Sequence, residues 1–424
     1  MRPNFNTSLL SKFETVRTPL TIAVGLRLGL GLMAFFAYIL YPQSSDRAFP
    51  SPTQDISDLS VIVDRTLTMW SNWDGNWYLQ IAEKGYQADP DSQAFFPLFP
   101  LLVRILGTLL FGNYRLAGII LSTFMAVVVL VIFYELIKRD YDRYLAERAV
   151  FYLSIFPTVF YLFAVYTEAT FMAFILGSFF AARHLKRWWL AGLLGGLGAL
   201  TRNVGVFMVI PLLVEWISYR LDVVKGEAGT QVKILQRDTL RKLFHPTLFS
   251  LVLPVVAFAG WLIFSQLVLG NALGSVTSHS NWSRSFSLPW ITLIEAVRPI
   301  LTPDPNGLVA IKIDWYQGAN LLDLGFFTVG FIVFLYGCWK NVRGQLPLSY
   351  LLFFAVGLFV PLLAPVKYTP LLSFPRFLLP IFPIFVLWAQ ACRHRNWLHF
   401  LTLYLWLPLL GILFILYANG YWVA

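Results

Sequence analysis

The sequence predicts an all-α protein that crosses a membrane about eleven times. The first reason is composition: 58% of the residues are hydrophobic and only 13% are charged, whereas a soluble domain carries about a quarter charged residues. The second reason is that apolar runs of about 17–23 residues recur along the chain, which is the length of a helix that spans a bilayer. These runs are too long for the alternating strands of a membrane β-barrel, which have about ten residues each.

The third observation is that short basic clusters alternate with the apolar runs. These clusters lie at residues 138–139, 182–187 ("ARHLKR"), 219–246, 340–345 and 392–396. Basic residues collect on the cytoplasmic side of membrane proteins, so the net charge of +10 indicates orientation and no nucleic-acid partner. Residues 42–94 carry eight acids against three basic residues and belong outside. The N-terminus is then cytoplasmic and the C-terminus extracytoplasmic.

The elements follow in chain order. The first apolar run, 19–41, is longer than a signal-peptide core and lacks a small-residue cleavage site, so we expect a retained helix. Residues 95–112 are apolar but hold two prolines and an arginine, which favours helices lying on the outer membrane surface. A full span returns inside at about 116–137. We expect one integral membrane domain over 1–424, with extracytoplasmic loops at 42–115 and 270–320 and a cytoplasmic loop at 219–246.

This topology brings most of the unusual polar residues near membrane segments to the extracytoplasmic face. They lie around Asp74, in "YTEAT" (166–170), "TRN" (201–203), "SHSNWSRS" (278–285), "PVKYTPLLSFPRF" (365–377) and "NGYW" (419–422). Because the charge clusters alone set the topology, the convergence indicates a functional site on that face.

Glu168 and Arg202 each lie between two short apolar runs. An ionisable residue at membrane depth costs several kcal/mol unless it is paired or hydrated, so both are candidate site residues. Arg376 lies between two prolines at an expected helix start, where an arginine opposes the helix dipole unless an anion meets it. For Lys367 and Arg284 the alternative, anchoring to lipid headgroups, remains open.

Asp74 lies between two indoles in "NWDGNWYLQIA", with Trp73, Trp77 and Tyr78 around it. Such rings hold a segment at the headgroup level, and Trp282 is a similar interfacial residue. The alternative is a solvated loop carboxylate, since seven other acids share the loop. The sequence contains no P-loop, GxSxG or HExxH motif. We expect no metal site, because His279 has no second ligand at a suitable spacing.

The stretches "WDGNWYLQIAEKGY", "AFFPLFPLL", "YTEATF", "LTRNVG", "SNWSR" and "PRFLLPIFP" occur in that order. In this respect the sequence resembles the PIG-V-like mannosyltransferases, which include GPI mannosyltransferase 2 and bacterial relatives. That family belongs to the GT-C class of membrane glycosyltransferases, which use polyprenyl-phosphate sugars. The resemblance runs from about residue 20 to the end of the chain. One departure is Trp77, where the family usually has histidine, so acceptor recognition is expected to differ.

The resemblance and the residues together imply inverting transfer of a hexose, expected to be mannose, from a polyprenyl-phosphate donor. The acceptor is a lipid-linked or glycan hydroxyl, and no further cofactor is expected. Asp74 is the expected catalytic base. The residues expected to bind the donor phosphate are Arg202, Arg376, Lys367 and Arg284. Those expected to bind sugar or acceptor are Trp73, Trp77, Tyr78, Glu168 and Trp282.

A transporter or flippase of lipid-linked sugars is the main alternative. Such a protein is expected to show internal repeats and ionisable residues leading to both faces. A transferase that uses a lipid diphosphate or a protein acceptor also stays open. The expected location is the bacterial plasma membrane, with the endoplasmic reticulum as the alternative.

Overall fold

The computed structural model describes residues 5–40, 59–228, 245–277, 283–301, 315–367 and 369–423. Within these ranges the regular secondary structure is helical, apart from one pair of bridged residues, Arg284 and Val366. Six described helical stretches are long and apolar enough to cross a membrane: Arg17–Ala37, Tyr114–Asp140, Asn203–Lys225, Pro246–Leu269, Gly318–Val342 and Asn396–Ala418. This confirms the expected all-helical, multi-pass membrane class. The finer count of about eleven spans stays a prediction.

The long helices are α1 (Phe5–Leu40), α5 (Tyr114–Asp140), α9 (Val209–Ala228), α11 (Leu253–Leu269), α14 (Trp315–Val342) and α18 (Asn396–Ala418). The shorter helices in the first half are α2 (Leu59–Thr68), α3 (Asp74–Lys84), α4 (Leu98–Leu109), α6 (Arg143–Ser154), α7 (Glu168–Phe180) and α8 (Trp188–Ala199). Those in the second half are α12 (Gly274–Thr277), α13 (Pro289–Leu301), α15 (Leu348–Phe359), α16 (Phe374–Leu378) and α17 (Pro383–Cys392).

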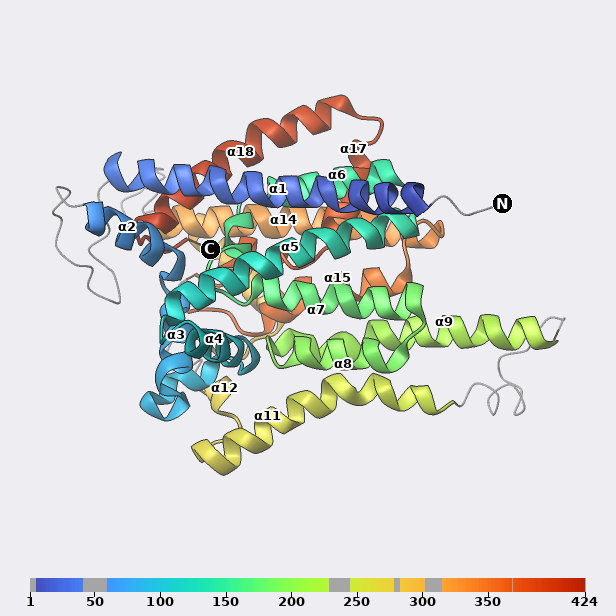
Figure 1. Ribbon diagram of the computed structural model, residues 1–424, viewed down its shortest axis with the longest axis horizontal. Coiled ribbons are helices and arrows are strands. Elements are labelled where there is room, and N and C mark those ends of the chain that lie inside the picture. Colours follow the sequence, from blue (N-terminus) through green and yellow to red (C-terminus); the bar gives the residue numbers. More distant parts are fainter. Residues whose placement is uncertain are drawn as a thin grey trace.

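The long helices run along the long axis of the molecule, and α2, α3, α4 and α12 gather near one end of them (Figure 1). Helix α5 lies in the middle and packs on α1, α4, α6 and α7. It begins at Asn113, whose side chain accepts the Leu116 amide at 3.0 Å, and its last turn holds Lys138 and Arg139. A polar N-cap and basic residues at the C-terminus both favour a helix.

Helices α7 and α8 form a tightly packed hairpin. A π-helical turn, Ala181–Leu185, follows α7, and Lys186 then takes a left-handed conformation with φ of 55° that reverses the chain. Helix α8 packs closely on the segment that leads into α11. A Cβ at Gly192 would lie 1.9 Å from the Ser250 carbonyl oxygen, so only glycine fits there. The glycines of "GLLGGLGAL" therefore serve helix packing.

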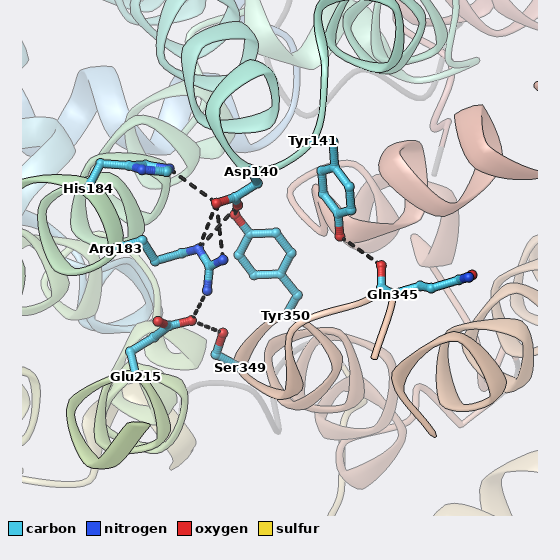
Figure 2. Close-up of polar contacts among 8 residues, drawn as sticks. All are labelled: Asp140, Tyr141, Arg183, His184, Glu215, Gln345, Ser349 and Tyr350. Carbon is cyan, nitrogen blue, oxygen red and sulfur yellow. Dashed lines mark hydrogen bonds and ion pairs between the residues drawn. The ribbon is translucent and has the colours of Figure 1, made fainter. Parts of the chain in front are cut away.

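A buried polar cluster joins four elements at the α9 end of this hairpin (Figure 2). Arg183 donates to Asp140 at the end of α5 at 3.0–3.1 Å and to Glu215 on α9. Tyr350 on α15 also hydrogen-bonds Asp140, and Ser349 hydrogen-bonds Glu215. We call these five residues the distal clamp. His184 lies 3.1 Å from Asp140, beside the clamp.

The distal clamp adds to the sequence interpretation. The "ARHLKR" stretch served there only as a basic cluster that indicates orientation, whereas in the structure the Arg183 side chain is 19% exposed and is paired inside the protein. Charge counting along the chain cannot detect this, because the acids that pair with Arg183 come from other helices. Polar residues therefore gather at both ends of α7, at Glu168 and at Arg183, about 22 Å apart along a helix.

Candidate active site

Asp74 begins α3 and is fixed by its neighbours. The preceding residue, Trp73, has a φ of 57°, which is rare for a bulky residue and often accompanies a functional site. The Val165 amide donates to the Trp70 carbonyl at 2.8 Å. Gly75 permits this approach, because a Cβ there would lie 3.3 Å from the Val165 carbonyl oxygen. The segment that carries Asp74 is thus held against the residues just before α7.

The two indoles beside Asp74 contact other parts of the protein. Trp73 donates from Nε1 to the Tyr421 carbonyl at 3.2 Å, and its ring meets Trp422 edge-on at 4.9 Å. Trp77 stacks on Phe95 with ring centroids 5.7 Å apart. The indoles therefore tie the Asp74 segment to the C-terminal segment and to the "FFPLFP" stretch. Their expected stacking on a sugar stays a prediction.

Four of the residues singled out from the sequence meet in one chain of ion pairs. Arg376 Nη1 lies 2.6 Å from Asp74 Oδ2, and Arg376 Nε lies 2.5 Å from Glu168 Oε1. Arg202 Nη1 lies 2.6 Å from the same Glu168 oxygen and 3.2 Å from Thr167 Oγ1. We call Asp74, Arg376, Glu168 and Arg202 the acid–arginine relay. Its members come from four segments that the sequence places up to 302 residues apart.

Exposure increases toward the two ends of the relay. The Glu168 side chain is 0% exposed and Arg376 7%, while Arg202 is 15% and Asp74 23% exposed. Two carboxylates and two guanidinium groups balance in charge, which is the condition for burying them together. The accessible groups are therefore one carboxylate and one guanidinium, held by a buried acid and a buried arginine.

The relay keeps unused hydrogen-bonding capacity. Within the described residues, the hydrogen bonds of Arg202 all come from Nη1, so its Nε and Nη2 have no acceptor there. Glu168 Oε2 is buried and has no hydrogen-bond partner there either. Buried polar atoms are nearly always paired, so each exception calls for a physical reason. A guanidinium with free N–H groups can bind two oxygens of a phosphate at once.

Tyrosines that the sequence analysis did not single out surround Arg376. The guanidinium lies 4.6 Å from the Tyr166 ring centroid and 5.2 Å from that of Tyr161, within the range of a cation–π interaction. Tyr166 donates to the Asn72 carbonyl at 2.8 Å, and Tyr161 hydrogen-bonds the Val423 carbonyl. The "YTEAT" stretch contained a signal for Tyr166, but only the fold could place Tyr161.

Tyr78 lies beside the relay in the protein interior. Its ring is 5% exposed and makes edge contacts with Phe95, Phe99 and Tyr166. Burial raises the pKa of the Tyr78 hydroxyl, and the negative charge of Asp74 raises it further, so the phenol stays protonated. This burial does not fit the expected stacking of Tyr78 on a sugar.

Arg284 and Lys367 line a groove of about 490 Å³ next to the relay. Antiparallel pairing joins the two loops, with the Lys367 amide donating to the Ser283 carbonyl at 3.1 Å. Arg284 donates from Nη1 to the Ala364 carbonyl at 2.9 Å. Burial lowers the pKa of Arg284, while the charge of Asp74 raises it and that of Arg376 lowers it. The Arg284 head group therefore lies within electrostatic reach of the relay.

The groove has a mixed polar lining. Its remaining residues are Ser283, Ser285, Phe286, Ser287, Thr292, Glu295, Pro365, Val366 and Pro370. Hydroxyl groups with a carboxylate and cations are suited to a hydroxylated, charged ligand. Trp282, also expected to bind sugar or acceptor, lies outside the described residues.

Residues 94–223 match a family model described as dolichyl-phosphate-mannose-protein mannosyltransferase. The matched segment contains Glu168 and Arg202, one half of the relay, but neither Asp74 nor Arg376. No curated protein shows significant sequence similarity to the chain. The closer resemblance to PIG-V-like enzymes stays a prediction.

Two solved structures are similar to this chain along most of its length. One is an oligosaccharyltransferase from Archaeoglobus fulgidus, with a TM-score of 0.46 and 13% identity over 98% of this chain and 56% of that chain. The other is ArnT from Cupriavidus metallidurans bound to undecaprenyl phosphate, with a TM-score of 0.44 and 13% identity over 88% of this chain and 60% of that chain. The chain thus spans little more than half the length of either. The family match is thus a likeness of residues 94–223, less than a third of the chain, to the dolichyl-phosphate-mannose-protein mannosyltransferases.

Proposed function

We propose that this protein transfers a hexose, with mannose as the first candidate, from a polyprenyl-phosphate donor to a hydroxyl group of a lipid-linked or glycan acceptor. The observation that carries this proposal is the acid–arginine relay. It presents one partly exposed carboxylate, Asp74, beside guanidinium groups that a buried Glu168 holds in place. These are the two kinds of group that glycosyl transfer from a phosphate needs.

In the proposed reaction, Asp74 accepts the proton of the acceptor hydroxyl as its oxygen attacks the anomeric carbon. The bond between that carbon and the phosphate oxygen breaks, and the electron pair goes to the phosphate. Attack opposite the leaving group inverts the anomeric configuration. A nearby carboxylate also stabilises the developing oxocarbenium charge.

The arginines act on the leaving group. Donor phosphate and product phosphate differ by about one negative charge, so a guanidinium binds the transition state more strongly than the ground state. Arg202 can use its Nε and Nη2 groups without losing Glu168. Arg376 is different, because its Nη1 is paired with Asp74. Arrival of the donor phosphate would let Arg376 exchange Asp74 for a phosphate oxygen and release the base.

The groove that contains Arg284 and Lys367 provides an approach for the acceptor. Its hydroxyl and charged lining matches a hydroxylated head group, and α13 beside it exposes apolar side chains, with Trp290 59% and Ile294 56% exposed. A lipid-linked acceptor would place its tail along that apolar surface and its head group in the groove. By the sequence-based topology, the relay and groove face the extracytoplasmic side of a plasma membrane.

The flippase alternative draws on one observation, the distal clamp at the other end of α7. A transporter would need its ionisable groups available along a path. In the clamp, the Arg183 guanidinium already pairs with two carboxylates, and Tyr350 and Ser349 donate to those same carboxylates. A closed network of this kind is suited to holding helices together, so the transferase is the better-supported function.

The test is transfer of radiolabelled sugar from polyprenyl-phosphate mannose and polyprenyl-phosphate glucose, with total lipid extract as acceptor. Membranes would contain wild type, Asp74→Asn, Arg202→Ala or the control Glu83→Gln, an exposed acid on the same helix. We expect Asp74→Asn to lower transfer by about 10²–10⁴-fold, as for loss of a general base, and Glu83→Gln to leave it unchanged. Undiminished transfer in Asp74→Asn would exclude Asp74 as the base. Absence of transfer from both donors, with labelled lipid crossing the bilayer, would favour the flippase.

A further inference from the structure

Helix α14 carries two polar side chains on one face, one helical turn apart. Asn320 and Asp323 are each 3% exposed, although they lie in a helix of membrane-spanning length. An ionisable residue within such a helix is expensive and is usually functional. The proposed reaction uses neither of them, so their contacts have to explain their presence.

The two side chains hold different elements. Asn320 donates from Nδ2 to the Ala296 carbonyl of α13 at 2.8 Å. Asp323 accepts the Phe374 amide at 3.2 Å, and the same amide also donates to the Leu371 carbonyl at 3.0 Å. Asp323 is thus the acceptor of this amide that comes from another helix. Phe374 is the first residue of α16, and Arg376 follows two residues later in the same helix. Asp323 therefore hydrogen-bonds the backbone of the element that carries the central arginine of the relay.

Helix α16 depends on such contacts for its position. It has five residues and is entered through Ser373, whose φ of 72° is left-handed. A helix this short has no stability of its own. Besides Asp323, the buried Thr158 donates to the Pro375 carbonyl at 3.1 Å. The Phe374 ring also packs edge-on against Phe327 at 5.2 Å.

The two ion pairs of Arg376 restrict how far α16 can move. One guanidinium must reach Glu168 with Nε and Asp74 with Nη1, at 2.5 and 2.6 Å. A shift of about 1 Å in a reacting group can cost about 10²-fold in rate. The hydrogen bond by which Asp323 ties the start of α16 to α14 therefore bears directly on the relay.

We propose that Asp323 is a positioning residue that acts through Arg376. It anchors the first amide of α16 so that the Arg376 side chain bridges Asp74 and Glu168. The catalytic part of this inference rests on the proposed function. The structural part, that Asp323 fixes α16, does not.

The catalytic part is tested by a double-mutant cycle on sugar transfer with Asp323→Ala and Arg376→Lys, where lysine keeps the charge but not the fork. We expect Asp323→Ala to lower transfer about 10-fold in the wild-type background, which is within the range of one lost hydrogen bond. In the Arg376→Lys background the same change should cost less than about 2-fold. Asp323→Asn should restore most of the rate, because its amide oxygen can accept the Phe374 amide.

Asn320→Ala is the matched control, since it removes an equally buried side chain from the same face of α14. Its effect should be the same in both backgrounds. Equal losses for Asp323→Ala in both backgrounds would show a merely structural role and overturn the proposal. Loss of rate in Asp323→Asn equal to that in Asp323→Ala would exclude a role as hydrogen-bond acceptor.

Hydrogen–deuterium exchange on the purified protein separates this inference from the proposed function. In Asp323→Ala the amides of Phe374 and of residues 376–378 should exchange about 10-fold faster than in wild type, in line with one lost hydrogen bond. In Asn320→Ala their exchange should be unchanged. Unchanged exchange in Asp323→Ala would overturn the positioning role, whatever the protein transfers. Faster exchange in a protein that transfers no sugar would instead confine the failure to the proposed function.

Discussion

The ion pair between Asp74 and Arg376 predicts an unusual result for Asp74→Asn. If the donor phosphate must displace Asp74 from Arg376, then the carboxylate competes with the phosphate for one guanidinium. Removing its negative charge should strengthen phosphate binding even though it slows sugar transfer. A base that contributed only to proton transfer would leave phosphate affinity unchanged.

The magnitude follows from the geometry of the pair. Two unit charges about 4 Å apart interact by about 4 kcal/mol at an effective dielectric constant of 20. Solvation offsets most of this, because the Asp74 side chain is 23% exposed. A net competition of about 1–1.5 kcal/mol corresponds to about 10-fold tighter binding in Asp74→Asn.

The assay is titration of detergent-solubilised protein with farnesyl phosphate, a short polyprenyl phosphate, for wild type, Asp74→Asn, Arg202→Ala and Glu83→Gln. Asp74→Asn should bind more tightly, Arg202→Ala more weakly, and Glu83→Gln like wild type. The predicted gain should shrink at high salt, where a partly exposed pair is screened. Equal or weaker binding by Asp74→Asn would refute the idea that the phosphate displaces Asp74 from Arg376.

Three further predictions concern the guanidinium of Arg202, the distal clamp and the start of α6. Arg202→Lys should keep the positive charge but lose the bidentate contact with the phosphate, so the rate of transfer should fall about 10-fold. In Arg202→Ala the rate should fall by at least a further 10-fold. A wild-type rate in Arg202→Lys would exclude bidentate phosphate binding. Arg183→Met should leave Asp140 and Glu215 of the distal clamp without their arginine and destabilise the protein by about 3–5 kcal/mol. This loss should appear as a lower thermal unfolding midpoint. The control Arg104→Met, at an exposed position of α4, should leave the unfolding midpoint unchanged. Asp142 accepts the Leu145 amide at 2.7 Å at the start of α6 and pairs with Arg393 at 2.9 Å. The backbone hydrogen bond from Leu145 lowers the pKa of the Asp142 carboxyl, and the pairing with Arg393 lowers it further, while burial acts in the opposite direction. Because the pKa is depressed in the folded protein, this stabilisation is present above the ordinary carboxyl range and is lost as the pH falls below it, so wild type and Asp142→Ala should differ in unfolding midpoint at neutral pH and converge in acid.

The sequence was sufficient for the fold class and for part of the site because both depend on local patterns. Run length and composition alone separate a helical membrane protein from other classes. Asp74, Glu168, Arg202 and Arg376 were recognisable as unusual polar residues near membrane segments on one expected face. Which acid pairs with which arginine was not recognisable, because the pairing of Asp74 with Arg376 is set by the packing of distant helices.

Two other features show where the sequence interpretation reached its limit. Asp140 lies in a charged stretch at the end of a span, and only the fold brings Arg183 to it and, through Arg183, Glu215. Asp323 did carry a signal, as one acid inside the apolar run "LLDLGFF". That signal could mark the residue but could not identify the Phe374 amide as its partner.

The relay is held from outside at Asp74 and at Arg376, and this bears on how it could work. Asp74 is tied to the residues before α7 and, through Trp73, to the C-terminal segment, while α16 is tied to Asp323 and Thr158. Groups fixed in this way need no reorganisation when charge develops, which is the main source of electrostatic catalysis. The same rigidity means that the arginines cannot move far toward a donor. The phosphate must therefore approach the relay, and the change left to Arg376 is the exchange of the Asp74 oxygen for a phosphate oxygen.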